Sequence, residues 1–385
     1  MNPETLGSLT DPDMVFTYVD LSAVRERRVV WNDTRQTRFA DSSSRARRVV
    51  RTGDAIFGTV RPANQSHASF QSLNDRVVVS TGFTVLRPDP AKLNHRYLHY
   101  LLFSRDVLRQ SVRAAVGSNY PAVTDQDVAE LKVNLPSLSN QLRIVETLDS
   151  LTDSESSIEA SIAKLRITRQ ARIDAAATCE ADGGCLGERL LRMDAGRSPD
   201  LPNAPAAPGA WGVLKVSAVH TDGFRPMENK AVTDPSHVNE RYRVHSGDLL
   251  ISRANTPELV GSACIASQTA QHLMLSDKTL RIVENPALAD REFINLCLAS
   301  EHVRQQISTL SSGSSRSMQN ISQKAISALI LPWPPLAAQR KTVAEVAALD
   351  TLIAAERANL AKLRSLKAGL VDDLLAGKVG FRNCA

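Results

Sequence analysis

Long apolar runs, paired cysteines and secretory signals are all missing from this sequence of 385 residues. No uninterrupted apolar stretch approaches the length of a membrane span, and no basic segment followed by an apolar one opens the chain. The cysteines are few, odd in number and scattered, which argues against a disulfide framework and favours a reducing, cytoplasmic setting. They are Cys179, Cys185, Cys264, Cys297 and Cys384.

Motifs for common enzyme chemistries are also absent. We find no Gly-x-x-x-x-Gly-Lys-Ser/Thr phosphate loop, no Gly-x-Gly-x-x-Gly and no Asn/Asp-Pro-Pro-aromatic motif of an amino-methyltransferase. No Cys-x-x-Cys or His-Glu-x-x-His spacing indicates a metal site. His95 and His99 could share a helix face but lack a third ligand nearby. The sequence therefore predicts neither a catalytic nor a metal centre.

The composition is that of a soluble globular protein. Hydrophobic residues make up 43% of the chain and charged residues 23%, and the length suggests two or three domains. The formal net charge is +5 at pH 7. This mild basicity permits a polyanionic partner without requiring one.

An internal repeat is the strongest pattern present. The same landmarks recur in the same order, offset by 194 residues at the first pair, 196 in the middle and 198 at the last. The pairs are Gly53-Asp54 with Gly247-Asp248, residues 80–86 with 276–282, 97–104 with 293–300, 117–119 with 313–315, and Gln141 with Gln339. Such a slow drift is expected of loop insertions in a duplicated unit.

Each copy has the same expected secondary structure. Short β-rich runs such as residues 76–80 come first, separated by turns. A helix follows, at 94–113 in the first copy and 290–310 in the second. A Gly-Ser loop then leads to a last strand, at 131–135 or 328–331, which a proline ends.

Two proline-free stretches, 139–182 and 336–376, each predict a long helix with a coiled-coil seam. Apolar residues recur there at alternating four- and three-residue steps, with Glu155, Glu356 and Lys367 as polar exceptions. The predicted seam residues are Ile144, Leu148, Leu151, Ile158, Ile162, Leu165, Leu349, Ile353, Leu360, Leu363, Leu370 and Leu374.

The two helices are natural partners because they have equal length and their seams align at the repeat offset. Each could reach about 60 Å, and antiparallel pairing would place the two globular copies at opposite ends of a rod. The alternative is that each helix packs separately on its own domain.

An arginine-rich segment in the first copy is the best candidate for DNA contact. Residues 25–61 hold ten arginines against four acids. Arginine can bind phosphates and can also donate two hydrogen bonds to guanine, while Asn and Gln can pair with adenine. The candidates here are Arg45, Arg47, Arg48, Arg61, Asn64, Gln65, Asn119 and Tyr120. A solvated charged loop is the plainer interpretation.

The second copy has different polar residues at similar points of its loops. The candidates are Arg253, Asn255, Ser315, Arg316, Gln319 and Asn320. Matching scaffolds with unlike polar loops are expected of two readers that share a fold and prefer different bases, although duplicated loops also diverge without a function.

The repeat, the helix starts that carry Leu-x-x-Gln after proline, and the heptads together resemble the DNA specificity (S) subunit of type I restriction–modification systems. The resemblance covers nearly the whole chain. The segments that carry it are residues 44–50, 53–54, 59–62, 80–83, 117–123, 138–141, 336–339 and 363–377.

The resemblance implies an α+β fold of two similar target-recognition domains separated by two long antiparallel helices that form an intramolecular coiled coil. The expected domains are residues 1–137 and 183–335, with a central conserved helix at 138–182 and a C-terminal conserved helix at 336–385. The first domain has a shortened N-terminal segment, because Leu6-Gly7 lies only fifteen residues before Ser22 whereas Leu186-Gly187 lies thirty before Ser217, and this puts its full activity in question.

The implied function is non-catalytic reading of a bipartite, asymmetric site on double-stranded DNA. The implied partners are two methyltransferase (M) subunits and motor–nuclease (R) subunits. S-adenosylmethionine, ATP and Mg would belong to those partners, with no cofactor in this chain and no membrane contact.

Three other functions stay open at this stage. The chain could be a stand-alone DNA-binding regulator, a coiled-coil scaffold without a DNA role, or a nuclease. Glu130-Leu131-Lys132 resembles half of a Glu-x-Lys nuclease site, but the equivalent stretch of the second copy has neither carboxylate nor lysine.

Overall fold

A computed structural model describes residues 1–177, 183–315 and 318–379. The chain forms two compact units, and each contains part of both long helices. Unit 1 comprises residues 1–159 and the chain from residue 358 onward, and unit 2 comprises residues 160–357. The strands of unit 1 are β1 (Val15–Val19), β2 (Val24–Arg25), β3 (Arg28–Val29), β4 (Arg35–Arg38), β5 (Ala46–Val50), β6 (Ala55–Gly58), β7 (Ala68–Ser69), β8 (Val77–Ser80) and β9 (Phe83–Leu86).

Two sheets form the core of unit 1. One has the order β4-β1-β8-β5, with β1 parallel to β8, and the other has the order β7-β6-β9. Val19, Ile56 and Phe83 belong to one buried cluster at the heart of this unit. β-Branched and aromatic side chains fit the half-buried surface of a strand, which explains why these short runs become strands.

Unit 2 repeats this plan with more strands. Its strands are β10 (Gly183–Cys185), β11 (Leu190–Ala195), β12 (Trp211–Leu214), β13 (Val219–His220), β14 (Gly223–Phe224), β15 (Asn229–Ala231), β16 (Leu249–Ser252), β17 (Ala254–Asn255), β18 (Ala263–Ile265), β19 (His272–Met274), β20 (Thr279–Glu284), β21 (Ser312–Ser315), β22 (Met318–Asn320) and β23 (Ile330–Pro332). Its larger sheets have the orders β11-β20-β16-β18, β15-β12-β19 and β17-β22-β21.

The pairing of strands confirms the duplication. β1 runs parallel to β8 in unit 1, as β12 does to β19 in unit 2. β6 and β9 pair antiparallel with Ile56 opposite Val85, and β16 and β20 do so with Leu250 opposite Arg281. Both the strand directions and the register therefore recur, which chance similarity of short apolar runs would not produce.

The sequence predicted one helix after the strands of each copy, and this is wrong. Each region instead contains two helices, α1 (His95–Leu102) and α2 (Arg105–Ala114) in unit 1, and α5 (Arg291–Leu298) and α6 (Glu301–Leu310) in unit 2. Ser104 and Ser300 are the N-caps of the second helices, where their hydroxyls accept a backbone N–H. Because a serine cap satisfies an N–H that has no partner inside the helix, a new helix begins there.

The predicted last strand is wrong for the first copy. Residues 131–135 are extended and pair with no strand among the described residues, whereas β23 pairs antiparallel with β10. The amide of Gln110 instead bonds both the N–H and the carbonyl of Lys132, at 2.9 and 2.8 Å. Gln306 does the same to Ile330 in unit 2. A strand depends on a neighbour, so its own residues do not determine it.

The N-terminal segments of the two copies differ, as their lengths predict. In unit 2, β11 pairs with β20 and places Asp194 opposite Arg281. In unit 1 the N–H of Asn2 donates to the carbonyl of Val85 at 2.7 Å, and the Asn2 side chain accepts the N–H of Val85 at 2.8 Å. In unit 1 a single asparagine thus forms hydrogen bonds with the edge of β9. In unit 2 the six-residue strand β11 pairs with the equivalent edge of β20.

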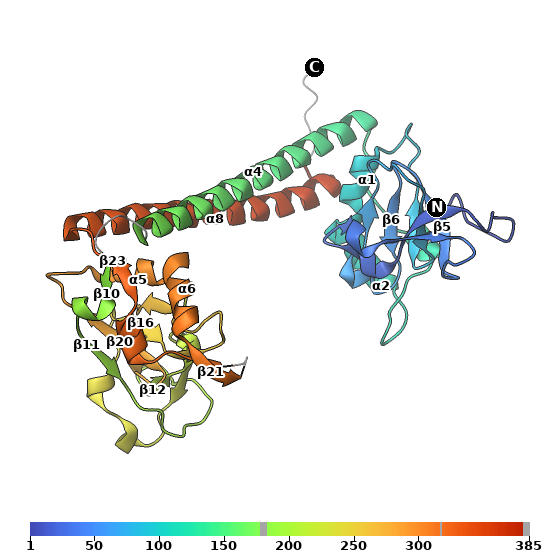
Figure 1. Ribbon diagram of the computed structural model, residues 1–385. Helices are drawn as coiled ribbons and strands as arrows, with labels where there is room; N and C mark the ends of the chain where they lie inside the picture. The colour runs from blue at the N-terminus through green and yellow to red at the C-terminus, as the bar shows by residue number, and fades with distance from the viewer. Residues whose placement is uncertain (178–182, 316–317, 380–385) are drawn as a thin grey trace. The chain divides into compact units, whose positions relative to one another are not determined.

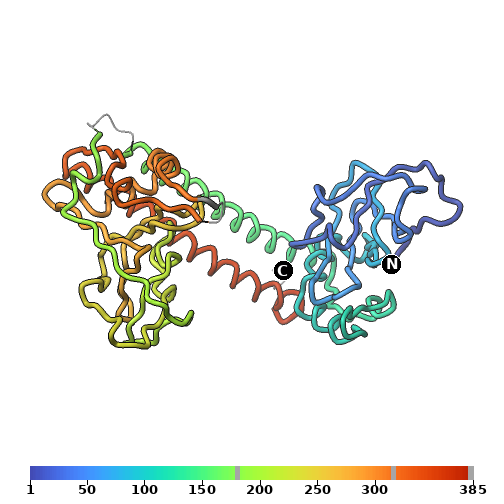
Figure 2. The backbone as a smooth tube through the Cα atoms, turned by 60° about the horizontal axis from the view of Figure 1, so that its bottom comes forward, coloured from blue at the N-terminus to red at the C-terminus, as the bar shows by residue number. Residues whose placement is uncertain are grey.

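The two long helices are α4 (Leu138–Ala177) and α8 (Leu336–Leu375), each forty residues long. They run alongside each other in both views (Figure 1 and Figure 2). Every predicted seam residue is buried or half-buried, while most positions between them are exposed. In the described part of the chain, no helix is both long and apolar enough to cross a membrane.

Contacts between α4 and α8 show that they are antiparallel, since residue numbers rise along one helix as those of their partners fall along the other. Leu148 and Leu374 belong to one buried cluster of unit 1. The ion pairs are Glu155 with Lys367 and Glu159 with Arg364 in unit 1, and Arg169 with Asp350 and Arg172 with Glu345 in unit 2. The helices therefore pack on each other, which confirms the predicted fold class with its intramolecular coiled coil.

A buried glutamine fastens the start of each long helix to the preceding globular part. Each side chain accepts the N–H of a helix N-cap residue and donates to two backbone carbonyls. For Gln141 the partners are Asn94 (2.8 Å), Lys92 (2.9 Å) and Pro136 (2.8 Å). For Gln339 they are Asp290 (2.9 Å), Leu288 (3.4 Å) and Pro334 (2.9 Å).

Candidate nucleic-acid interface

The first group of predicted DNA contacts lies at β5, an edge strand of its sheet. Arg45 is exposed, and Arg47 is half-buried with its guanidinium over the ring of Phe39. Arg48 differs, because its guanidinium donates two bonds to Asp125 at 2.9 and 2.7 Å and its side chain is only 14% exposed. The guanidinium of Arg48 is therefore occupied inside the domain, and we leave it out of the interface.

The second group comes together from two loops of unit 1. The N–H of Arg61 donates to the carbonyl of Pro121, and the Arg61 guanidinium donates to the carbonyl of Asn119 at 3.1 Å. The guanidinium also lies 4.5 Å from the centre of the Tyr120 ring. Asn64 is exposed on the short turn that follows Arg61. The loops thus form one surface that we call the arginine loop pair, made of residues 61–65 and 117–121.

Unit 2 brings its predicted residues together in the same region of the fold. β17 pairs with β22, which places Asn255 opposite Gln319 and Ala254 opposite Asn320. Only the backbone of Ser315 is described, paired with Met318. Predicted Arg316 lies outside the described residues, as do Cys179 and Cys384. We call residues 253–255 with 318–320 the amide loop pair.

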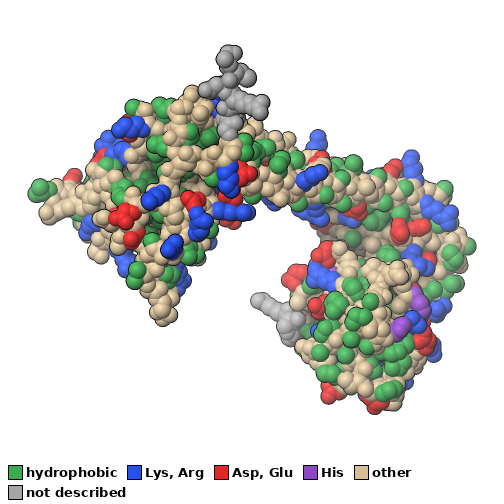
Figure 3. All heavy atoms as spheres, turned by 180° about the vertical axis from the view of Figure 1, so that it is seen from behind, with side chains coloured by type: hydrophobic (Ala, Val, Ile, Leu, Met, Phe, Trp, Pro, Cys, Tyr) green, Lys and Arg blue, Asp and Glu red, His purple; other side chains and the backbone are tan. Residues whose placement is uncertain are grey.

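Charge is distributed rather than concentrated. On the face drawn in Figure 3, Lys and Arg side chains are mixed with Asp and Glu along the helices and over both units. Several arginines outside the loop pairs lie in ion pairs, among them Arg87 with Asp54 at 2.7 Å and Arg281 with Asp194 at 2.9 Å. On this face, contact with a polyanion would therefore depend on particular exposed groups rather than on one broad basic patch.

Sequence reasoning missed two features that support these loops. The side-chain amides of Gln110 and Gln306 bond the backbones of Lys132 and Ile330. The two glutamines lie at the repeat offset of 196, and the sequence could have revealed them by this spacing. The buried His67 could not have been found from the sequence, because it has no counterpart in the repeat pattern. Its Nδ1 accepts the N–H of Gly58 at 3.0 Å, and its ring stacks on Phe57 with centroids 4.0 Å apart.

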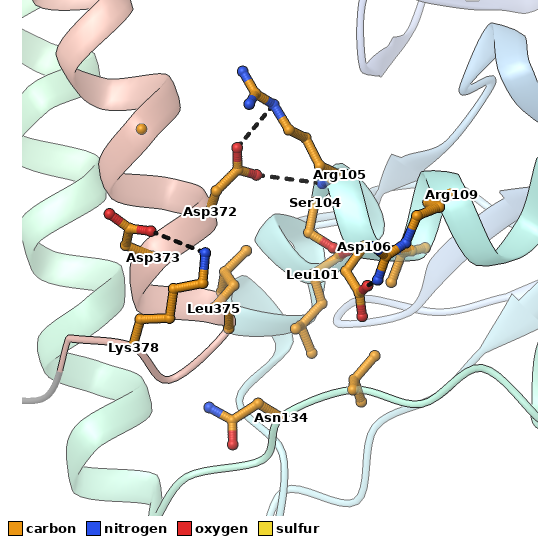
Figure 4. A pocket seen from close by; sticks show the side chains of 14 residues that line it. Leu101, Ser104, Arg105, Asp106, Arg109, Asn134, Asp372, Asp373, Leu375 and Lys378 are labelled. Atoms are coloured by element: carbon orange, nitrogen blue, oxygen red, sulfur yellow. Dashed lines mark hydrogen bonds and ion pairs between the residues drawn. The ribbon is translucent and has the colours of Figure 1, made fainter.

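A cleft of unit 1, with a volume of about 780 Å³, lies among α1, α2, residues 133–134 and the end of α8 (Figure 4). Its charged groups engage one another. Asp372 accepts the backbone N–H of Arg105 at 3.4 Å and pairs with its guanidinium at 2.9 Å, and Lys378 lies 3.6 Å from Asp373. Asp372 thus fastens α8 to the start of α2.

No group of three His, Cys, Asp or Glu side chains within the described ranges is arranged to hold a metal ion. The stretch that resembles a nuclease motif is also engaged otherwise: Glu130 accepts a bond from Gln126 at 2.9 Å, and Lys132 is bonded through its backbone to Gln110. The best-formed polar surfaces are therefore the two loop pairs.

Part of the chain resembles known proteins in sequence. Residues 49–166 match the family model described as the type I restriction modification DNA specificity domain. The specificity subunit of the type I restriction enzyme EcoEI from Escherichia coli is 33% identical over 162 residues, which cover 42% of this chain and 27% of that subunit. The match thus spans about a quarter of the relative's own length.

Two solved structures share the fold over nearly the whole chain. The HsdS subunit from Thermoanaerobacter tengcongensis is 24% identical with a TM-score of 0.60, covering 98% of this chain and 94% of that one. A chain from a structure described as the structural basis of complex assembly and conformational transition of the type I R-M system is 24% identical with a TM-score of 0.69, covering 98% and 95%. These structures confirm the fold that the sequence resemblance predicted, and residues 49–166 are those that resemble the type I restriction modification DNA specificity domain.

Proposed function

We propose that this chain is the sequence-reading subunit of a type I restriction–modification complex and recognises a bipartite, asymmetric site on double-stranded DNA. One observation carries the proposal: the same α+β scaffold occurs twice, and its equivalent loops present an arginine with a tyrosine in one copy and carboxamides in the other. Two copies with unlike polar loops suit the reading of two unlike half-sites.

The paired helices suit the role of a spacer and a docking surface. Two weak half-site contacts joined by a stiff connection act as one tight site, since the second binds at high effective concentration. In this proposal the helices dock two methyltransferase subunits and the motor–nuclease subunits. Those partners would supply S-adenosylmethionine, ATP and Mg, while this chain is non-catalytic, holds no cofactor and acts in the cytoplasm.

A stand-alone DNA-binding regulator is the second candidate, because the same loop pairs could read DNA without enzyme partners. The two functions differ in what they require. A regulator binds its site tightly alone, whereas the specificity subunit needs its methyltransferase for tight binding.

Methylome sequencing of cells that carry this chain with its neighbouring methyltransferase tests the proposal. We expect one bipartite motif methylated on adenine, and exchange of residues 1–137 for those of a related subunit should change only one half. Absence of any methylated motif that depends on this chain would reject the proposed function. A change in both halves would reject the modular assignment.

A further inference from the structure

Arg61 and Asn255 occupy the same position in the two copies of the fold. The residue two positions before each makes the same backbone bonds. Its N–H donates to a carbonyl in the turn that precedes β9 or β20, and its carbonyl accepts an N–H from beyond the Gly-Ser loop. In unit 1 the bonds of Thr59 are to Gly82 (2.9 Å) and Val123 (3.0 Å). In unit 2 those of Arg253 are to Lys278 (2.9 Å) and Ile321 (2.9 Å).

The Arg61 side chain is held in one orientation although it is exposed. Its guanidinium is stacked over Tyr120, whose side chain is 70% exposed, and one of its nitrogens donates to Asn119. A guanidinium has five N–H donors, so this contact leaves most of them available. Stacking reduces the rotamer freedom that binding would otherwise remove.

The backbone at this loop is also unusual. Arg61 and Gln65 have φ values of 50° and 47°, a left-handed conformation that residues other than glycine rarely adopt. Pro62 begins the short turn between them. Such conformations persist only where the surrounding structure holds them, and they cluster at functional sites.

The equivalent position of unit 2 carries carboxamides instead. Asn255 is paired across β17 and β22 with Gln319, so the two side chains lie on the same face of the small sheet. The Asn255 oxygen accepts the N–H of Thr256 at 2.9 Å, and a carboxamide oxygen has a second lone pair. The Asn255 carboxamide can therefore still donate one hydrogen bond and accept another along the same edge of the group.

We propose that Arg61 reads a guanine in one half-site and that Asn255, aided by Gln319, reads an adenine in the other. The inference rests on the proposed function. An arginine fork matches O6 and N7 of guanine, and a carboxamide matches N6 and N7 of adenine. Arg61 and Asn255 thus give one duplicated scaffold two base preferences at a single structural position.

The test uses the assembled complex of this chain with its methyltransferase, and duplexes in which each base pair of the methylated motif is replaced in turn. Arg61→Ala removes the guanidinium, whereas a lysine at this position could still donate to both O6 and N7 of guanine. We expect the alanine variant to lose discrimination at one G·C pair by roughly tenfold to hundredfold, with the other half-site read as before. Asn255→Ala should do the same at one A·T pair of the other half.

Arg225→Ala is the matched charge control, because Arg225 forms an exposed ion pair with Asp222 and belongs neither to a loop pair nor to the arginine-rich segment 25–61. It should leave every base preference unchanged. If Arg61→Ala keeps full discrimination, or weakens all duplexes equally, Arg61 does not read a base and the inference is overturned while the bipartite motif stands. A chain with no methylated motif would instead reject the function itself, so the two failures are distinguishable.

Discussion

The carboxylate of Glu155 and the ammonium of Lys367 meet across the helix seam, 3.0 Å apart. Both side chains are only about one-sixth exposed, at 17% and 18%. Lys367 also donates to the hydroxyl of Thr152 at 2.8 Å. These are two of the polar exceptions in the heptad pattern, one on each helix. A shift of one helix along the other would set each charge against apolar seam residues, so the pair favours a single register.

Removing one charge of this pair should destabilise unit 1. Glu155→Leu leaves the Lys367 ammonium half-buried without its partner, and we expect the free energy of unfolding to fall by about 1–3 kcal/mol. The double variant Glu155→Leu with Lys367→Leu should recover most of this loss, because apolar residues pack as well as a buried pair. Urea denaturation of the parent chain, the single variants Glu155→Leu and Lys367→Leu, and the double variant gives the coupling energy directly.

The exposed pair Glu159–Arg364 provides the control on the same helices. Its side chains are 51% and 56% exposed, so Glu159→Ala should change the unfolding free energy by less than about 0.5 kcal/mol. Equal costs for Glu155→Leu and Glu159→Ala would contradict a role of the seam pair in fixing the register.

The two buried glutamines should act on separate units. Gln141→Leu leaves the N–H of Asn94 and two carbonyls without partners, which we expect to cost about 2–4 kcal/mol in unit 1. Hydrogen exchange should quicken around α1 and not around α5, and Gln339→Leu should give the reverse pattern. Gln126→Ala, which removes one exposed bond to Glu130, is the control. Quickened exchange in both units from either variant would argue against independent anchors.

Arg48 should behave differently from its neighbours Arg45 and Arg47. Arg48→Ala removes the partly buried pair with Asp125 and should lower the melting temperature without altering how DNA binding depends on salt. The double variant Arg45→Ala with Arg47→Ala should leave the melting temperature nearly unchanged. It should flatten the slope of log K against log salt by up to about 0.9 for each phosphate that these arginines neutralise. Fluorescence anisotropy across a salt series measures the slope.

Acid should destabilise unit 1 through the buried His67 and the half-buried His99. Burial lowers the pKa of His67 to about 3, and burial with nearby Arg27 lowers that of His99 to about 4. The unfolded chain binds these protons near pH 6.5. Both pKa values are depressed in the folded state. The stability that the two neutral histidines contribute is therefore complete above about pH 6.5 and is lost as the pH falls towards 4. Thermal melts between pH 7 and pH 4 should show this loss.

His99→Asn is the control for the acid effect, because Asn295 stands at the equivalent position of α5. The variant removes one titrating group, so its melting temperature should fall less between pH 7 and pH 4 than that of the parent chain. An unchanged pH dependence in both His99→Asn and a matching His67→Gln variant would show that other groups cause the acid effect.

Some parts of the fold could be read from the residues because they depend on local spacing. The seam of α4 and α8 follows from heptad periodicity, since residues three and four apart share a helix face. The duplication follows from landmarks such as Gln141 and Gln339, which recur because each makes the same three bonds. The candidate interface was predicted only as a set of loop residues, and the pairing of its loops was not.

The sequence by itself determined that two similar units and two long helices exist, because periodicity and repetition are properties of residue order. Only the tertiary structure decided that Arg48 lies in a partly buried ion pair, that residues 131–135 are clamped by an amide instead of a strand, and that the Arg61 guanidinium lies over the ring of Tyr120. Each of these depends on groups brought together from distant parts of the chain. Such contacts are selected by packing and by the satisfaction of buried polar groups, and residue order alone does not specify them.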